Sequence, residues 1–141
     1  MHTSSQVLRV DNLSIELPAG ADRSHAVQGI SLEVRKGEIL CVIGESGSGK
    51  SVLSAAIMGD YAKGLRHSAG HIDFLGQDIC AMDDEALRQL RGNRIAMIFQ
   101  EPMAALNPAI RIGRQVEEIF AIHAPKTVSY THLTLPTNRE V

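Results

Sequence analysis

The sequence has no strong charge of either sign and few residues that could crosslink it. Its 141 residues carry 14 basic and 16 acidic side chains, a net charge of -2, which gives no electrostatic case for a nucleic-acid partner. The two cysteines, Cys41 and Cys80, fit neither a disulfide framework nor a metal-ligand spacing, and we expect them to be buried or half-buried thiols. The histidines are scattered without the spacing of metal ligands. The composition therefore predicts no nucleic-acid partner, no disulfide and no histidine metal site.

Long apolar runs are also missing. No run approaches the roughly 18 residues of a membrane-spanning helix, and the N-terminus, MHTSSQVLRV, has neither the charged segment nor the apolar core of a signal peptide. We therefore expect no part of these residues to enter a bilayer by itself. Hydrophobic residues make up 44% of the chain, which is enough for one domain with an ordinary core.

The first half of the chain shows a strand pattern. Alternating apolar residues predict strands over 7–17 and 26–34, joined by a turn over 18–25. Residues 38–43 are almost entirely apolar, which predicts a strand buried on both faces inside a parallel or mixed sheet. A helix is predicted over 52–58 and ends at a glycine.

The second half is richer in helix signals. Residues 63–70 are predicted as a loop and 71–75 as a short strand. Asp83 is expected to cap a helix that closes at Gly92. After a further apolar run at 95–99, an amphipathic helix is predicted over 112–123. Strands followed by helices predict a mixed α/β layer structure.

The stretch GESGSGKS, residues 44–51, matches the phosphate-binding loop pattern G-x-x-x-x-G-K-[ST]. Glycines allow the backbone to approach closely and point several N–H groups at one anion, and the helix that follows adds the partial positive charge of its N-terminus. Lys50 would bring a full charge to the β- and γ-phosphates, and the Ser51 hydroxyl would reach Mg²⁺. A chance match in a surface linker is expected about once in two hundred chains of this length. The loop therefore predicts a polyphosphate site.

The order of strand, GESGSGKS, helix and then RGNRIAMIFQEPMAALNP resembles the ATP-binding subunit of ABC transporters. The segments GESGSGKSV and RIAMIFQEPMAALNP are most similar to the branch that imports peptides and nickel, which includes dipeptide, oligopeptide and glutathione uptake systems. The resemblance runs from about residue 7 to residue 123, and its second motif is the more specific. It implies an α/β fold of the P-loop NTPase type over residues 1–127, an ABC-type nucleotide-binding domain with an antiparallel β subdomain, truncated within the helical subdomain.

The resemblance also assigns roles to residues. Gln100, which its place after an apolar run leaves open between a loop residue and a site residue, matches the glutamine that reaches Mg²⁺ and the attacking water. Lys50 and Gln100 are thereby implied in catalysis, and Ser51 and Gln100 in holding the metal. Leu17 stands where the family has an aromatic residue that stacks on adenine, so base stacking departs from the family pattern. The residues implied in nucleotide binding are Gly44, Glu45, Ser46, Gly47, Ser48, Gly49, Lys50, Ser51 and Val52.

The resemblance implies ATP and Mg²⁺ as cofactors. The implied partners are transmembrane permease subunits, contacted near residues 101–112, a second ATP-binding subunit and, indirectly, an external substrate-binding protein, at the cytoplasmic face of the inner membrane. The signature motif, the Walker B aspartate, the catalytic glutamate and the switch histidine of the family do not occur in the 141 residues. We therefore expect the chain to bind nucleotide phosphate without completing hydrolysis.

The last fourteen residues, VSYTHLTLPTNREV, do not resemble the family. They are similar to translated sequencing-adapter sequence, so 128–141 is predicted to be a non-native tail. Two other functions stay open on the motif alone. One is another phosphate-loop enzyme, such as a small-molecule kinase or a GTPase, and the other is a module of the same fold that binds nucleotide for regulation or assembly.

Overall fold

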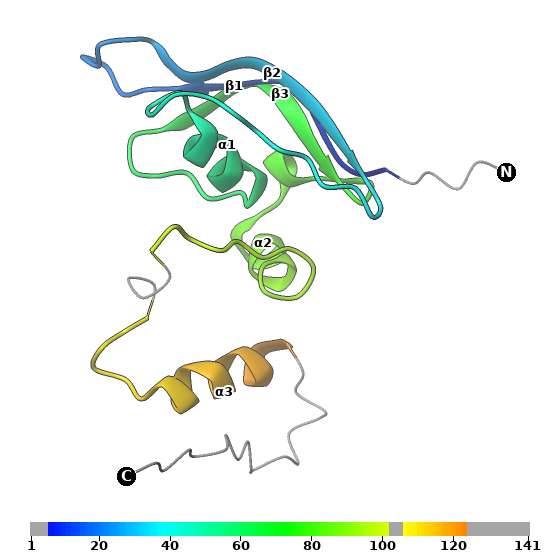
Figure 1. Cartoon of the computed structure of the whole chain (residues 1–141), viewed down its shortest axis with the longest axis vertical. Helices are drawn as coiled ribbons and strands as arrows, with labels where there is room; N and C mark the ends of the chain where they lie inside the picture. The colour runs from blue at the N-terminus through cyan, green and yellow to red at the C-terminus, as the bar shows by residue number, and fades with distance from the viewer. Residues whose placement is uncertain (1–5, 102–105, 124–141) are drawn as a thin grey trace, which may run out of the picture. The chain divides into compact units, whose positions relative to one another are not determined.

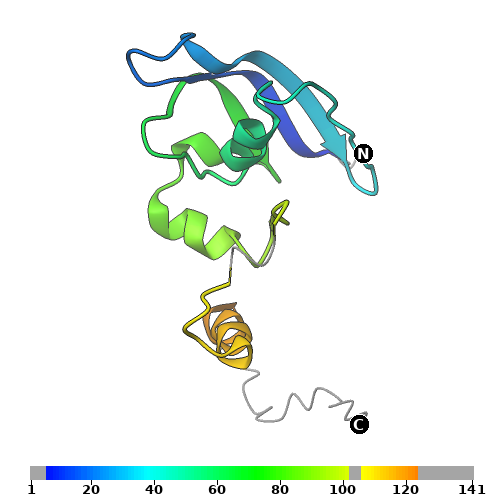
Figure 2. The ribbon, with the colours of Figure 1, turned by 60° about the vertical axis from the view of Figure 1, so that its left-hand side comes forward.

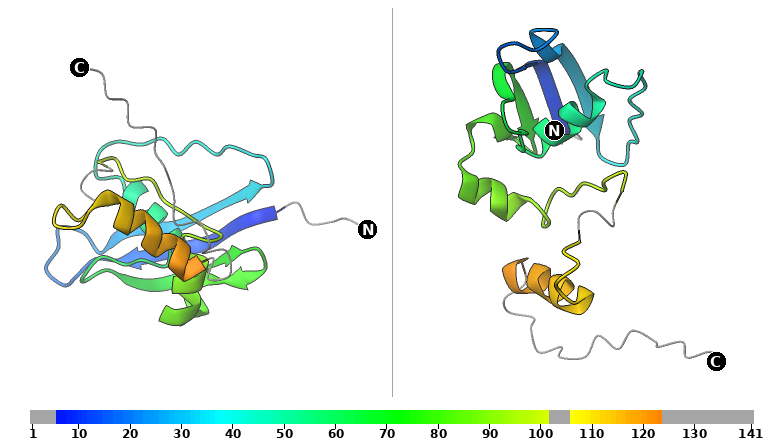
Figure 3. Two further views of the ribbon diagram at one scale, coloured as in Figure 1. Left: turned by 90° about the horizontal axis from the view of Figure 1, so that it is seen from below. Right: turned by 90° about the vertical axis from the view of Figure 1, so that its left-hand side faces the viewer.

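The structure is a computed structural model that describes residues 6–101 and 106–123. It divides into two compact units, one ending at Arg91 and the other beginning at Gly92, and each is described by itself. The first unit is built on an antiparallel sheet with the strand order β2-β1-β3-β4, so β1 lies between two long neighbours (Figures 1 and 3). The strands are β1 (Gln6–Glu16), β2 (His25–Arg35), β3 (Arg66–Phe74) and β4 (Gln77–Asp78).

The two predicted N-terminal strands are confirmed, and a third begins earlier than predicted. On β1, Val10 lies opposite Leu32 of β2 on one side and Ile72 of β3 on the other. Residues 66–70, predicted as loop, are the first part of β3, because they pair with the end of β1, where Glu16 lies opposite Arg66. Pairing with a distant strand outweighs local composition here.

One face of the sheet carries the core. The helix α1 (Lys50–Ile57) and the 3-10 turn η1 (Ile79–Ala81) both lie on this face (Figures 1 and 2). Burial of apolar surface between these layers is the main stabilising contribution, at roughly 25 cal/mol per Å². The largest fully buried side chains are Val10, Leu13, Ile15, Ile72 and Ile79.

The end of α1 confirms the predicted glycine stop. Gly59 has φ +67°, its N–H donates to the Ala56 carbonyl at 2.8 Å, and the Asp60 N–H donates to the Ala55 carbonyl at 2.9 Å. This pair of bonds is the Schellman motif, which favours glycine at the left-handed position. The Arg91 guanidinium donates to the carbonyls of Met58 and Gly59, both at 2.8 Å, so a cation also satisfies the negative end of the helix dipole.

The helix α2 (Asp84–Leu90) begins where its cap predicts. The Asp83 carboxylate accepts the Ala86 N–H at 2.8 Å, which satisfies one of the N–H groups that a helix start leaves without a partner. Leu87 and Leu90 on one face of the helix are buried. The predicted cap and apolar face are both confirmed.

The apolar segment 38–43, predicted as a buried strand, is not a strand. It lies in an irregular stretch, traced in cyan in Figure 1, and Ile39 and Ile43 are 95% and 90% exposed. Cys41 is exposed too, against its predicted burial, whereas Cys80 is half-buried as expected. An apolar strand needs neighbours that pair its backbone and layers that cover both faces. Within the described residues, no strand pairs with this segment.

The second unit contains α3 (Ile112–His123), which confirms the amphipathic helix predicted over the same residues. The Gln115 side chain fixes the loop before the helix. Its Oε1 accepts the Asn107 N–H at 3.0 Å, and its Nε2 donates to the carbonyls of Asn107 and Ile110 at 3.0 and 2.7 Å. One side chain thus holds this loop onto the first turns of α3.

The apolar run at 95–99 forms no strand, and Ile98 in it is 91% exposed. Gln100 follows it in an exposed bend. Residues 102–105 and the predicted tail at 128–141 lie outside the described part of the chain. In the described part, no helix combines the length and the apolar character needed to cross a membrane.

A half-buried tyrosine with a buried hydroxyl provides a pH-dependent contribution to stability. The Tyr61 hydroxyl is buried without a hydrogen-bond partner among the described residues. Burial, together with the nearby Cys80 thiol and Asp78 carboxylate, raises the pKa of Tyr61 to about 12. Burial also raises the pKa of the Cys80 thiol. No bond of hydrogen-bond geometry joins the two side chains, so we attribute the shifts chiefly to loss of solvent.

Because the folded pKa of Tyr61 lies above the ordinary value of 10.0, its neutral form contributes stability below about pH 10 that is lost as the pH rises towards 12. We expect Tyr61→Phe to remove this loss and to change stability little at pH 8, since it deletes a buried hydroxyl without a partner. Urea unfolding of both proteins at pH 8 and pH 11 checks this. An equal loss of stability in both proteins between these pH values would contradict it.

Candidate phosphate-binding site

The predicted phosphate loop lies directly before α1 and its last residues form the start of that helix, as expected, although the strand predicted before the loop, over 38–43, is not formed. The loop closes on itself through the Ser48 N–H, which donates to the Glu45 carbonyl at 3.2 Å. The helix then begins with the Leu53 N–H donating to the Gly49 carbonyl at 2.8 Å. The remaining N–H groups of this first turn have no partner within the helix and carry the positive end of its dipole. The loop and the helix start therefore form one electropositive backbone surface.

Lys50 is folded back over this loop. Its ammonium donates to the carbonyls of Gly44 and Glu45 at 2.7 and 2.6 Å and to the Ser48 hydroxyl at 3.2 Å. An ammonium has three donors, so all three are used within the loop. A compact cation held in this way, beside a helix N-terminus, can exchange its neutral acceptors for the charged oxygens of a polyphosphate, which form stronger bonds.

Gly49 joins the loop to the sheet. It has φ +93° as the N-cap of α1, and a Cβ built there would lie 2.5 Å from the Ala26 carbonyl oxygen and 3.1 Å from Cγ2 of Val27. Both of these residues belong to β2 and are buried. Only glycine fits both the left-handed backbone and the close contact.

The residues around the loop differ in what they can contribute. Glu45, Ser46 and Ser51 are exposed, and Val52 is half-buried in the first turn of α1. The Ser51 hydroxyl makes no hydrogen bond with the described residues. Mg²⁺ in nucleotide sites is held by one or two protein oxygens together with phosphate oxygens and water, so a single serine hydroxyl at this place fits that ion. No group of three His, Cys, Asp or Glu side chains in the described residues could hold a metal by itself.

The other predicted site residues belong to different parts of the chain. Gln100 belongs to the second unit, and it is exposed there. Leu17 follows the end of β1, and its N–H donates to the Ser24 carbonyl at 2.9 Å. It lines a hollow of about 550 Å³ formed by the β1–β2 loop. Its aliphatic side chain offers no π face, so it cannot stack on a base as an aromatic residue would.

The structure adds a residue that sequence reasoning missed. Arg23, in the β1–β2 loop, donates from Nη2 to the Gly47 carbonyl of the phosphate loop at 2.8 Å. No local pattern marks it, since the sequence places it in an ordinary turn. Only the packing of that turn against the loop reveals the contact.

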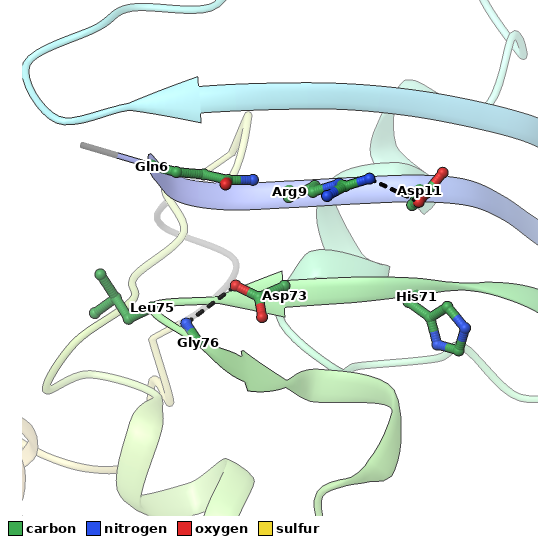
Figure 4. A pocket seen from close by; sticks show the side chains of 7 residues that line it. All are labelled: Gln6, Arg9, Asp11, His71, Asp73, Leu75 and Gly76. Carbon is green, nitrogen blue, oxygen red and sulfur yellow. Dashed lines mark hydrogen bonds and ion pairs between the residues drawn. The ribbon is translucent and has the colours of Figure 1, made fainter. Parts of the chain in front are cut away.

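A different hollow, of about 660 Å³, lies on the sheet face at β1 and β3 (Figure 4). Its charged groups already have partners. Arg9 pairs with Asp11 at 3.1 Å, the Asp73 carboxylate accepts the Gly76 N–H at 3.0 Å, and His71 faces Asp78, outside the hollow, at 3.5 Å. This hollow therefore shows no chemistry that would favour it over the phosphate loop.

The Gly49 contact gives a steric test of the loop. We expect Gly49→Ala to weaken Mg-ATP binding at least tenfold and to lower the melting temperature, because the added Cβ must displace backbone of β2. Gly37→Ala is the matched control, since Gly37 also has φ +80° but a Cβ there meets nothing within 4 Å. Both variants bear a left-handed backbone penalty of roughly 1–2 kcal/mol. Equal effects of the two variants on nucleotide binding would contradict the steric assignment.

Comparison with known proteins identifies the family of this chain. A family model described as ABC transporter matches residues 27–139. The probable D,D-dipeptide transport ATP-binding protein of Escherichia coli K12 is 43% identical over 124 residues, covering 84% of this chain and 37% of that protein. The dipeptide transport ATP-binding protein of Bacillus subtilis 168 is 40% identical over 121 residues, covering 84% of this chain and 36% of that protein. The chain thus spans little more than a third of the length of these curated relatives.

Solved structures show the same fold. A bacterial Atm1-family ABC exporter with ATP bound is 26% identical with a TM-score of 0.51, over 72% of this chain and 16% of that chain. The dimeric ATP-binding cassette MJ0796 bound to ADP and Pi is 17% identical with a TM-score of 0.56, over 81% of this chain and 54% of that chain. The family model matches residues 27–139, which is most of this chain, so the chain belongs to the ABC transporter family.

Proposed function

We propose that this chain is the nucleotide-binding part of an ABC importer's ATP-binding subunit, which couples ATP binding and hydrolysis to the uptake of peptides or a related small substrate. The observation that carries the proposal is the Lys50 ammonium, held by two loop carbonyls at the N-terminus of α1. A fixed cation beside a helix start favours a phosphate group.

Each residue of the loop has a proposed role in holding Mg-ATP. Residues 44–52 supply backbone N–H groups to the phosphates, and Lys50 binds the β- and γ-phosphates. The Ser51 hydroxyl is a ligand for Mg²⁺. Gln100 contacts the metal and orients the attacking water, as the family resemblance implies. When bound, Mg²⁺ supplies charge neutralisation between the phosphates.

The transport role rests on the relatives. Those at 43% and 40% identity are named as ATP-binding proteins of dipeptide transport, which supports peptides as the substrate class. The proposed partners are transmembrane permease subunits, a second ATP-binding subunit and, indirectly, an external substrate-binding protein. We propose that the subunit is peripheral and lies at the cytoplasmic face of the inner membrane, where residues 101–112 contact the permease.

Removal of the lysine charge tests the site. We expect Lys50→Ala to weaken Mg-ATP binding by about 10- to 100-fold, since hydrogen bonds to charged groups contribute roughly 1.5–3 kcal/mol. Titration calorimetry of the full chain measures it. Lys36→Ala is the control, because Lys36 is exposed in the turn after β2 and should leave binding unchanged. Equal affinity of Lys50→Ala and the unmodified chain would refute the phosphate site.

Hydrolysis requires more than a grip on the phosphates. It needs an in-line water, a group that positions it and charge stabilisation in the transition state, and the 141 residues contain neither the Walker B aspartate nor the catalytic glutamate of the family. We therefore propose that this chain alone does not turn over ATP. Phosphate release from Mg-ATP should stay at the level of Lys50→Ala, and release clearly above that level would show that another group in these residues supports hydrolysis.

A further inference from the structure

The phosphate loop is held by a second cation from outside the motif. Lys50, which belongs to the loop, donates to the carbonyls of Gly44 and Glu45. Arg23, 24 positions earlier in the sequence, donates to the carbonyl of Gly47. Three carbonyls within four consecutive residues are thus turned towards two positive charges. An anion approaching the loop therefore meets less of the negative end of these peptide dipoles.

The Arg23 bond fixes one peptide plane. A trans peptide group is planar, so the Gly47 carbonyl and the Ser48 N–H point in opposite directions. Arg23 holds the carbonyl end at 2.8 Å, and the Glu45 carbonyl holds the N–H end at 3.2 Å. Glycine at position 47 allows this peptide to rotate more readily than any other residue would. Without Arg23, only the longer of the two bonds would resist that rotation.

Arg23 can hold the Gly47 carbonyl although its side chain is not in the core. It is exposed and forms no ion pair with the described residues. Its neighbour in the same hollow, Arg66, is bound instead to the Glu16 carboxylate at 2.5 Å. The two arginines therefore line one hollow with equal charge, and only one of them contacts the phosphate loop.

We propose that Arg23 is a positioning residue for the phosphate site, which holds the Gly47–Ser48 peptide in the orientation that presents the Ser48 N–H to the interior of the loop. Arg23 acts through the loop rather than on the nucleoside. The inference rests on the proposed nucleotide-binding function.

The test compares two probes on the full chain, Mg-ATP and Mg-tripolyphosphate, the second of which has phosphates but no nucleoside. The variants are Arg23→Gln, Arg23→Lys and, as a charge-matched control, Arg66→Gln. We expect Arg23→Gln to lower the affinity for both probes by a similar factor of about three to ten, which corresponds to one lost hydrogen bond. Arg23→Lys keeps a charged donor and should recover most of the affinity, and Arg66→Gln should change it less than twofold.

A local readout separates positioning from general stability. Exchange of the Ser48 amide hydrogen should accelerate in Arg23→Gln, while the melting temperature stays within about 1 °C because the side chain is exposed. The proposal is overturned if Arg23→Gln binds tripolyphosphate as the unmodified chain does, if only Mg-ATP binding falls, or if Arg66→Gln has the same effect. If the unmodified chain binds neither probe, the proposed function fails together with this inference.

Discussion

The contact between Gly49 and the first residues of β2 is the constraint on which the site depends. Gly49 begins α1 and lies so close to the Ala26 carbonyl that no Cβ fits between them. The helix start is therefore fixed to a strand that pairs with β1, and β1 carries Val10, Leu13 and Ile15 of the buried core. Lys50 is the next residue, so this contact also fixes where its charge lies, at the first turn of α1. The packing of the sheet and the position of the proposed phosphate site are thus linked through Gly49.

The carbonyls of the loop are oriented by charged side chains rather than by burial. The loop is mostly exposed, and its carbonyls are held by Lys50 and Arg23. Exposed charges contribute little to folding stability because water screens them, but they can fix the direction of a few peptide groups. A phosphate loop needs that directional control more than it needs apolar contacts. The hydrogen bonds from Lys50 and Arg23 explain how a segment rich in glycine and serine can still have a defined shape.

Apolar character and burial do not coincide everywhere in the chain. The segment 38–43 has the composition of a buried strand, yet it is exposed. The same holds for Ile98 in the apolar run at 95–99. Composition reports what a segment requires, whereas burial depends on neighbours that pair its backbone and cover its faces. The helices were easier to predict, because their bonds and caps are local. Asp83 at the start of α2 and Gly59 after α1 act within a few residues of themselves.

The sequence by itself determined the glycine-rich motif at 44–51, the long strands at the N-terminus and the helix over 112–123, because each depends on residue types at short, regular spacing. Only the tertiary structure decided where β3 begins, which apolar segments stay exposed and that Arg23 contacts Gly47. Each of these depends on which distant segments meet. A turn residue such as Arg23 carries no local signal of its partner, because that partner is chosen by the packing of β2 against the loop.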